Sequence, residues 1–272
     1  MGRYKSKSSV KTENAKKIAY AQLAFAAIVI IGLIWAVYSV TRDRKTLDPV
    51  TACPPSASSI TVLLVDVTDP LTLAQRQDFL NQLERLRASV PRYGKLAIFQ
   101  VDAASNELLR PVIERCNPGT AADVDEMTGN PAAVEEKYQS LFKQPLDEAF
   151  GKLMNASGAD RSPILESVQS VALTELKRPG VEGKPIRLII ASDLLQNTDR
   201  ISFYGALPAS RELLASDAFR VLRTDLSDIK VELWMLQRLD AQQSQPKALI
   251  DLWDAVITEQ GGTVTRAYNV SG

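Results

Sequence analysis

The stretch Ile60-Thr-Val-Leu-Leu-Val-Asp66 is a run of β-branched and apolar residues that ends on a carboxylate. Runs of this kind form strands that are buried on both faces of a sheet. Ile186-Arg-Leu-Ile-Ile-Ala-Ser192 repeats the pattern and is followed directly by Asp193. Further strands are expected at 95–102, 230–236 and 263–268, with helices at 72–90, 106–115, 132–154, 162–176, 209–222 and 245–260. This alternation predicts an α/β fold with a doubly wound, mainly parallel sheet.

An uncharged apolar run, Ile18 to Val40, precedes this domain. A hydrocarbon core of about 30 Å requires a helix of roughly 20 apolar residues. The run is longer than the apolar core of a cleaved signal peptide, and Val40 is too bulky for a cleavage site. Both faces of the run are apolar, which argues against a core helix. We therefore predict an uncleaved transmembrane anchor.

Basic residues dominate the segment before this run, whereas the segment after it carries acids and bases together. Lys and Arg are retained on the cytoplasmic side. The expected protein is thus a single-pass protein of a bacterial inner membrane, with its N-terminus inside and its domain in the periplasm. The expected boundaries are 1–17 for a cytoplasmic tail, 18–40 for the anchor, 41–58 for a linker and 59–272 for the domain.

The composition excludes several classes of function. The chain has 32 basic and 32 acidic residues, and because its N-terminal tail is basic, the domain is slightly acidic. This balance gives no support for nucleic-acid binding. Histidine is absent from all 272 residues. Its absence removes Ser-His-Asp and Cys-His triads and histidine-ligated zinc sites.

Two cysteines occur, Cys53 and Cys116. An isolated pair in an oxidising compartment is a disulfide candidate, and the alternative is two unpaired thiols in a reducing one. Cys53 precedes the first strand, and Cys116 ends the helix expected at 106–115. Both are expected at the sheet edge opposite the strand ends that carry Asp66 and Asp193, so they can meet there.

Oxygen-bearing side chains follow the expected strands at the edge where such sheets bind ligands. Thr68 and Asp69 come after Asp66, Ser162 begins a helix, and Asp193 follows the central strand. Carboxylates and hydroxyls suit a hard divalent cation such as Mg²⁺, Mn²⁺ or Ca²⁺. We expect Asp66, Thr68, Ser162 and Asp193 to hold such an ion, with Asp69 as an additional ligand.

In these residues the chain resembles the von Willebrand factor A (vWA) family, over residues 58 to 270. Asp66 and Thr68 match the first Asp and first Ser of that family's Asp-x-Ser-x-Ser metal-ion-dependent adhesion motif. Ser162-Pro163 resembles its Thr-Pro-Leu stretch, and Asp193 resembles the Asp of its Ser-Asp-Gly. The resemblance implies a bound ion that keeps one coordination position open for an acidic residue of a protein partner.

The chain departs from the family pattern in two residues. Pro70, which has no side-chain oxygen, stands where the family has its second Ser, and Leu194 stands where Gly is usual. We also identify no counterpart of the family's short antiparallel edge strand. The motif is therefore degenerate.

These residues also have local interpretations. Asp66, Thr68 and Ser162 are residue types that cap turns and helices, and Pro163 in a first helical turn favours Ser162 as an N-cap. Asp193 could simply begin a loop. The aromatic pair Phe203 and Tyr204 either anchors that loop on the core or binds a partner.

The preferred function is a membrane-anchored protein-interaction module of a bacterial envelope complex, dependent on a divalent cation. One alternative is a metal-dependent hydrolase, because Asp66-x-Thr68 faintly resembles the aspartyl-nucleophile loop of haloacid-dehalogenase phosphatases. That family has Asp where Thr68 stands. Another alternative is a metal-free scaffold with the same fold.

Overall fold

The computed structural model describes residues 7–42, 46–66, 71–102, 107–124, 129–154, 161–238 and 247–270. The chain divides into two compact units, Met1–Thr46 and Leu47–Gly272. Each unit has its own architecture.

The first unit contains the helix α1, Lys7–Arg42. Its segment Ala19–Tyr38 has a mean hydropathy of 2.2 and none of it is buried, so α1 is long and apolar enough to cross a membrane. The apolar run that predicts an anchor is thus continuous helix.

The second unit is built on a six-stranded sheet in the order β3-β2-β1-β4-β5-β6. Its strands are β1 Ile60–Val65, β2 Lys95–Gln100, β3 Ile113–Cys116, β4 Ile186–Ser192, β5 Ile229–Leu236 and β6 Thr263–Val270. All neighbouring pairs are parallel except β2 and β3, which are antiparallel. The predicted α/β fold with a mainly parallel sheet is confirmed.

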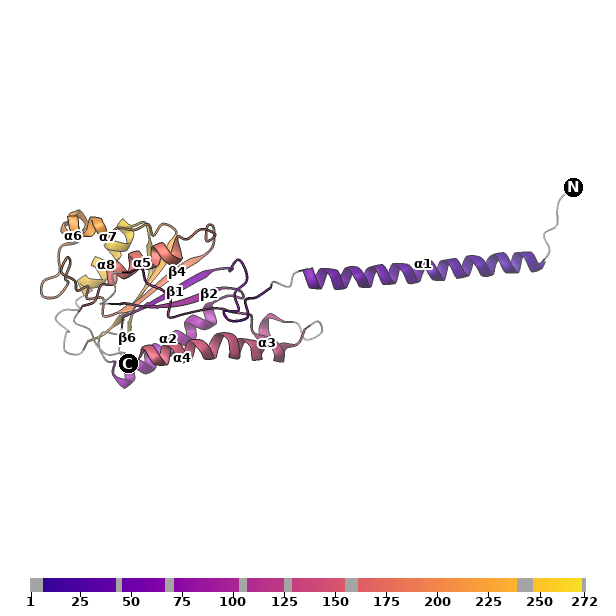
Figure 1. The fold of residues 1–272 in the computed structure, drawn as a ribbon, viewed down its shortest axis with the longest axis horizontal. Coiled ribbons are helices and arrows are strands. Elements are labelled where there is room, and N and C mark those ends of the chain that lie inside the picture. Colours follow the sequence, from indigo (N-terminus) through magenta and orange to yellow (C-terminus); the bar gives the residue numbers. More distant parts are fainter. Residues whose placement is uncertain are drawn as a thin grey trace. The chain divides into compact units, whose positions relative to one another are not determined.

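Helices cover both faces of the sheet, and Figure 1 shows the two layers. One layer holds α5 Ile164–Val171, α6 Ser210–Ala215, α7 Asp217–Leu222 and α8 Lys247–Glu259. The other holds α2 Leu73–Ser89, α3 Pro131–Tyr138 and α4 Gln144–Leu153. Alternate side chains of β1 enter different cores: Val62 and Leu64 pack under the first layer, whereas Leu63 and Val65 pack under the second. This division is why the central strands are apolar at most positions rather than at alternate ones.

The helix predicted at 106–115 is wrong, because residues 113–116 form β3. Leu108, Leu109, Val112 and Ile113 imitate helical spacing, but Pro111 within that pattern disfavours a helix interior. Cys116 pairs with Lys95 and Ile113 with Ile98, so β3 satisfies the edge of β2. The antiparallel edge strand that the sequence did not reveal is therefore present.

Three other predicted helices are divided or irregular. Ser216 is extended and accepts a hydrogen bond from the backbone N–H of Phe219, which separates α6 from α7 within the range expected as one helix. A π-helical turn, Gln139–Lys143, joins α3 to α4, and another, Ala172–Leu176, continues α5. A short 3₁₀ turn, Ala121–Asp123, lies in the loop before α3.

The helix α2 begins where its sequence indicates. Thr72 and Gln75 form a reciprocal capping box, in which each side chain accepts a hydrogen bond from the other's backbone N–H. Not all of its leucines are in the core, since Leu73 is 87% exposed and Leu80 is also exposed. These two lie seven residues apart and therefore share the outer face.

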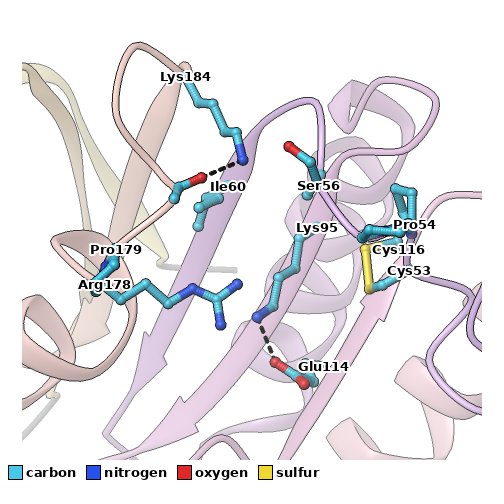
Figure 2. Close-up of a pocket in the computed structure, with 13 residues that line it drawn as sticks. Cys53, Pro54, Ser56, Ile60, Lys95, Glu114, Cys116, Arg178, Pro179 and Lys184 are labelled. Atoms are coloured by element: carbon cyan, nitrogen blue, oxygen red, sulfur yellow. Dashed lines mark hydrogen bonds and ion pairs between the residues drawn. A yellow bond between two sulfur atoms is a disulfide. The ribbon is translucent and has the colours of Figure 1, made fainter.

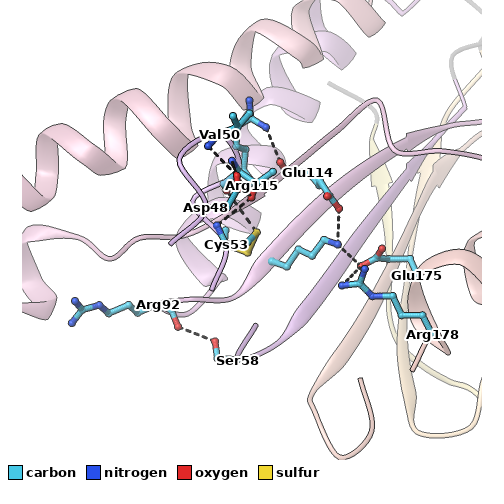
Figure 3. The surroundings of a disulfide bond; sticks show 12 residues. Asp48, Val50, Cys53, Ser58, Arg92, Glu114, Arg115, Glu175 and Arg178 are labelled. Carbon is cyan, nitrogen blue, oxygen red and sulfur yellow. Dashed lines mark hydrogen bonds and ion pairs between the residues drawn. A yellow bond between two sulfur atoms is a disulfide. The ribbon is translucent and has the colours of Figure 1, made fainter. Parts of the chain in front are cut away.

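Residues 47–58, which were expected in the linker, are bonded to the amino-terminal edge of the sheet. Cys53 and Cys116 form a disulfide, and the N–H of Cys116 donates to the carbonyl of Thr51 at 2.9 Å. Figure 3 shows this bridge beside β2 and β3. The predicted cysteine pairing is present, and Cys116 reaches this edge as the end of a strand rather than of a helix.

A recess of about 450 Å³ lies beside the disulfide at this edge. The ammonium of Lys95 is buried there and pairs with Glu114 at 2.6 Å and Glu175 at 2.8 Å. Figure 2 shows Arg178 extending toward Lys95 from the opposite wall. Lys95 is already paired with two carboxylates. We therefore interpret the charged groups of this recess as a structural ion-pair network and not as a ligand site.

Candidate functional site

The candidate site lies at the carboxyl edge of the sheet, where β1 and β4 end side by side. Val65 is in register with Ala191, and the N–H of Asp66 donates to the carbonyl of Ala191 at 2.8 Å. Asp66 and Ser192 therefore occupy neighbouring strand ends, and Asp193 follows immediately. Sheet register alone thus brings two carboxylates and one hydroxyl together.

Asp66 is 3% exposed and is held by two hydroxyl groups. Ser162 Oγ donates to Asp66 Oδ2 at 2.5 Å, and Ser192 Oγ donates to the same oxygen at 3.2 Å. Both hydroxyls come from residues distant in sequence, so Asp66 holds separate parts of the chain together. It is the point where side chains from three segments of the chain meet.

Ser162 is presented by a backbone bridge and not by a helix cap. Its N–H donates to the carbonyl of Asn197 at 3.0 Å, and the N–H of Asn197 donates back at 2.9 Å. The helix α5 begins at Ile164, after Pro163, and the side-chain amide oxygen of Gln196 accepts from the N–H of Leu165 at 2.9 Å. The N-cap interpretation of Ser162 is therefore wrong, and its hydroxyl is directed to Asp66.

Asp193 has both carboxylate oxygens engaged. The N–H of Leu195 donates to Oδ1 at 2.9 Å, and Arg238 Nη1 donates to Oδ2 at 3.1 Å. The pKa of Asp193 is raised to about 6, mainly by burial and also by the negative charge of Asp66, although the hydrogen bond from Leu195 and the Arg238 guanidinium act to lower it. The two buried carboxylates therefore repel each other, and Arg238 compensates this repulsion in part.

Leu194 has a φ of 62°, in the left-handed region that glycine adopts without strain. This is the position at which the vWA pattern has Gly. The Leu194 side chain is fully buried, and its carbonyl accepts from the indole N–H of Trp253 at 2.9 Å. Packing and this hydrogen bond hold the turn that directs Asp193 into the site.

The two aromatic residues predicted to bind a partner differ in exposure. Phe203 is 1% exposed and packs edge-on against Trp253, so its partner-binding role is wrong and its anchoring role is correct. Tyr204 is 42% exposed, and its hydroxyl accepts a hydrogen bond from Arg238 Nη1 at 2.5 Å. Tyr204 thus connects the surface to the cation that pairs with Asp193.

Sequence reasoning missed Ser192, Gln196 and Arg238. Ser192 immediately precedes Asp193 at a strand end, which is a signal that could have identified it. Arg238 lies 45 residues after Asp193 and reaches it because β5 is the neighbour of β4. Gln196 is fully buried, and its side chain ties the segment after β4 to the first turn of α5. It accepts from the N–H of Leu165 and donates to the carboxylate of Glu166.

Thr68, Asp69 and Pro70 lie outside the described residues, so their contribution to the site stays a prediction. Among the residues that the structure does describe, no group of three or more Asp, Glu, Cys or His side chains is gathered as a metal cluster. The converging oxygens belong to two carboxylates, Asp66 and Asp193, and two hydroxyls, Ser162 and Ser192. By its chemistry this donor set fits a hard divalent cation.

Neither protein-family models nor curated proteins match this sequence. Among solved structures, the SpRpn10 VWA domain matches with 9% identity and a TM-score of 0.40, over 79% of this chain and 90% of that one. BatB from Bacteroides thetaiotaomicron matches with 10% identity and a TM-score of 0.35, over 78% and 91%. An aerotolerance-related membrane protein from Bacteroides fragilis NCTC 9343 matches with 10% identity and a TM-score of 0.33, over 79% and 92%.

The sheet of this chain carries the antiparallel edge strand β3 beside five parallel strands, with helices on both faces. The fold is vWA-like. In this vWA-like domain, Asp66, Ser162 and Asp193 come together at one edge, as the motif resemblance implies.

Proposed function

We propose that this chain is a membrane-anchored, extracytoplasmic protein-interaction module of a bacterial envelope complex. The observation that carries this proposal is the convergence of Asp66, Ser162, Ser192 and Asp193 from three chain segments at the carboxyl edge of a doubly covered sheet. Ligands of such sheets bind at this edge. The exposed Tyr204 borders the convergence and offers a contact for a partner.

Two features support the extracytoplasmic placement of the domain. The apolar helix α1 follows a basic tail, which is retained on the cytoplasmic side. Cys53 and Cys116 are bonded, and disulfides persist in oxidising compartments. Alkylation of intact cells without reductant should leave both cysteines unlabelled, whereas labelling of both would place the domain in the cytoplasm.

We further propose that the edge binds Mg²⁺, Mn²⁺ or Ca²⁺ through Asp66, Ser162 and Asp193, with Thr68 and Asp69 as the remaining predicted ligands. The ion would supply positive charge for an acidic group of the partner. The metal-free scaffold remains a second candidate, favoured by the guanidinium of Arg238 on Asp193. Asp66 accepts hydrogen bonds from two hydroxyls and is almost fully buried, which gives no support to a nucleophilic role in a hydrolase.

Site-specific photo-crosslinking tests the interaction face. A photoreactive residue replaces Tyr204, and a matched control replaces Glu182, which is exposed in the turn before β4 at the opposite edge. We expect a defined crosslinked partner at position 204, no such product at position 182, and loss of the product in Asp193→Ala. Equal crosslinking at both positions would refute the assignment of the face.

A further inference from the structure

Arg238 is a basic side chain that pairs with Asp193, one of the two buried carboxylates of the site. Its Nη1 donates to Asp193 Oδ2 at 3.1 Å and to the hydroxyl of Tyr204 at 2.5 Å. The Arg238 side chain is 19% exposed, so its guanidinium is mostly withdrawn from water. The Nη1 amino group thus donates to both a buried acid and a half-exposed phenol, which fixes the guanidinium at the rim of the site.

The position of this guanidinium conflicts with cation binding at the same carboxylate. Asp193 Oδ1 accepts the N–H of Leu195 and Oδ2 accepts from Arg238, so an ion that coordinates Oδ2 would lie against the guanidinium. Two cations on one carboxylate oxygen in a buried site repel each other strongly, because the low local dielectric weakens screening. Arg238 and a divalent cation therefore compete for one oxygen.

We propose that Arg238 is a tethered cation that holds Asp193 when no divalent ion is bound, so that Arg238 and the ion are mutually exclusive at this residue. The proposal rests on the cation binding proposed above and adds its regulation. Without the ion, Arg238 would keep the contacts seen here, on Asp193 and on the hydroxyl of Tyr204. In the ion-bound state, Arg238 leaves Asp193 and its link to Tyr204 is released at the surface.

This exclusion identifies the chemistry of the partner that would act together with the ion. An acidic group that pairs with the displaced guanidinium stabilises the state in which Asp193 is open. Such a group raises the affinity for the ion, and the ion raises the affinity for the acidic group by the same factor, because linkage is reciprocal. Tyr204, on the other side of Arg238, would contact the same partner segment.

Cation titration of the full chain in detergent tests the exclusion. MnCl₂ and MgCl₂ are titrated calorimetrically into the wild type, Arg238→Gln and the control Arg220→Gln, which removes an exposed guanidinium on α7 that pairs with Asp217. We expect Arg238→Gln to bind Mn²⁺ at least tenfold more tightly than the wild type, as loss of a competing charge-assisted hydrogen bond predicts. Arg220→Gln should match the wild type.

Thermal unfolding in EDTA and in MgCl₂ gives an independent readout. Arg238→Gln should unfold at a lower temperature than the wild type in EDTA. Mg²⁺ should raise the unfolding temperature of Arg238→Gln by more than it raises that of the wild type. A purely structural role of Arg238 would not produce this difference. If Arg238→Gln fails to fold, Tyr204→Phe removes only the hydroxyl that fixes Arg238, and we expect about threefold tighter binding of Mn²⁺.

The outcomes separate this proposal from the one on which it rests. Equal affinities in the wild type, Arg238→Gln and Tyr204→Phe would overturn the exclusion and leave cation binding standing. Absence of binding in every variant would overturn both the exclusion and the proposed cation, while crosslinking at position 204 would still report on the interaction module.

Discussion

Removal of the disulfide should destabilise the domain by a calculable amount. The bridge joins residues 63 positions apart and encloses β1, α2, β2 and β3. In the chain-entropy model, a closed loop of this length lowers the stability of the unfolded state by about 4 kcal/mol. For a domain of this size, such a loss lowers Tm by roughly 10 °C.

The assay is urea unfolding of residues 47–272, comparing the wild type with Cys53→Ala/Cys116→Ala. We expect a lower midpoint and a larger m-value in the double variant, since its unfolded chain exposes more surface. The wild type in a thiol-free phosphine reductant serves as the control and should match the variant. A loss below about 1 kcal/mol, or an unchanged m-value, would contradict the entropic argument.

Three further changes follow from single contacts in the domain. Lys95→Met should cost about 3 kcal/mol because it leaves buried Glu175 with only the longer pair to Arg178, at 3.7 Å, and the added substitution Glu175→Gln should recover much of this loss in urea unfolding. Thr72→Ala removes the capping box of α2 and should cost about 1 kcal/mol in the same assay, whereas Thr72→Ser should cost little. The Asp193 carboxyl, with its pKa raised from 3.8 to about 6, binds a proton in the folded state before it does in the unfolded state. The stability of the wild type relative to Asp193→Asn should therefore fall by about 2 kcal/mol as the pH rises from 4 to 7, and a flat difference would show that the pKa is not raised.

The sheet could be predicted because its central strands are buried on both faces. Ile60–Val65 and Ile186–Ser192 are almost continuous apolar runs, and few other structures place every side chain of six residues in a core. The edge strand β3 could not be predicted in this way. It is half-exposed, and the spacing of Leu108, Leu109 and Ile113 is compatible with a helix until pairing with β2 is known.

The residues of the candidate site likewise fall into those that the sequence could predict and those that it could not. Asp66 and Asp193 were predictable, because each carboxylate directly follows a strand of the buried type and parallel strands end at one edge. Ser162 could be placed near that edge, but the direction of its hydroxyl depends on the bridge to Asn197, which pairs residues 35 positions apart. The sequence contains no local pattern that distinguishes an N-cap from a donor to a distant carboxylate.

Arg238 was beyond prediction because its contact with Asp193 depends on β5 lying beside β4, and it bears most directly on the proposed function. Arg238 brings a positive charge to Asp193, and the pKa of Asp193 stays raised beside it. Buried charges that are incompletely compensated destabilise a fold relative to apolar residues of the same volume. An arrangement kept for stability alone would therefore favour apolar side chains at these strand ends. Two acids and a guanidinium at the ligand-binding edge are better explained by an exchange of cations at Asp193 during binding.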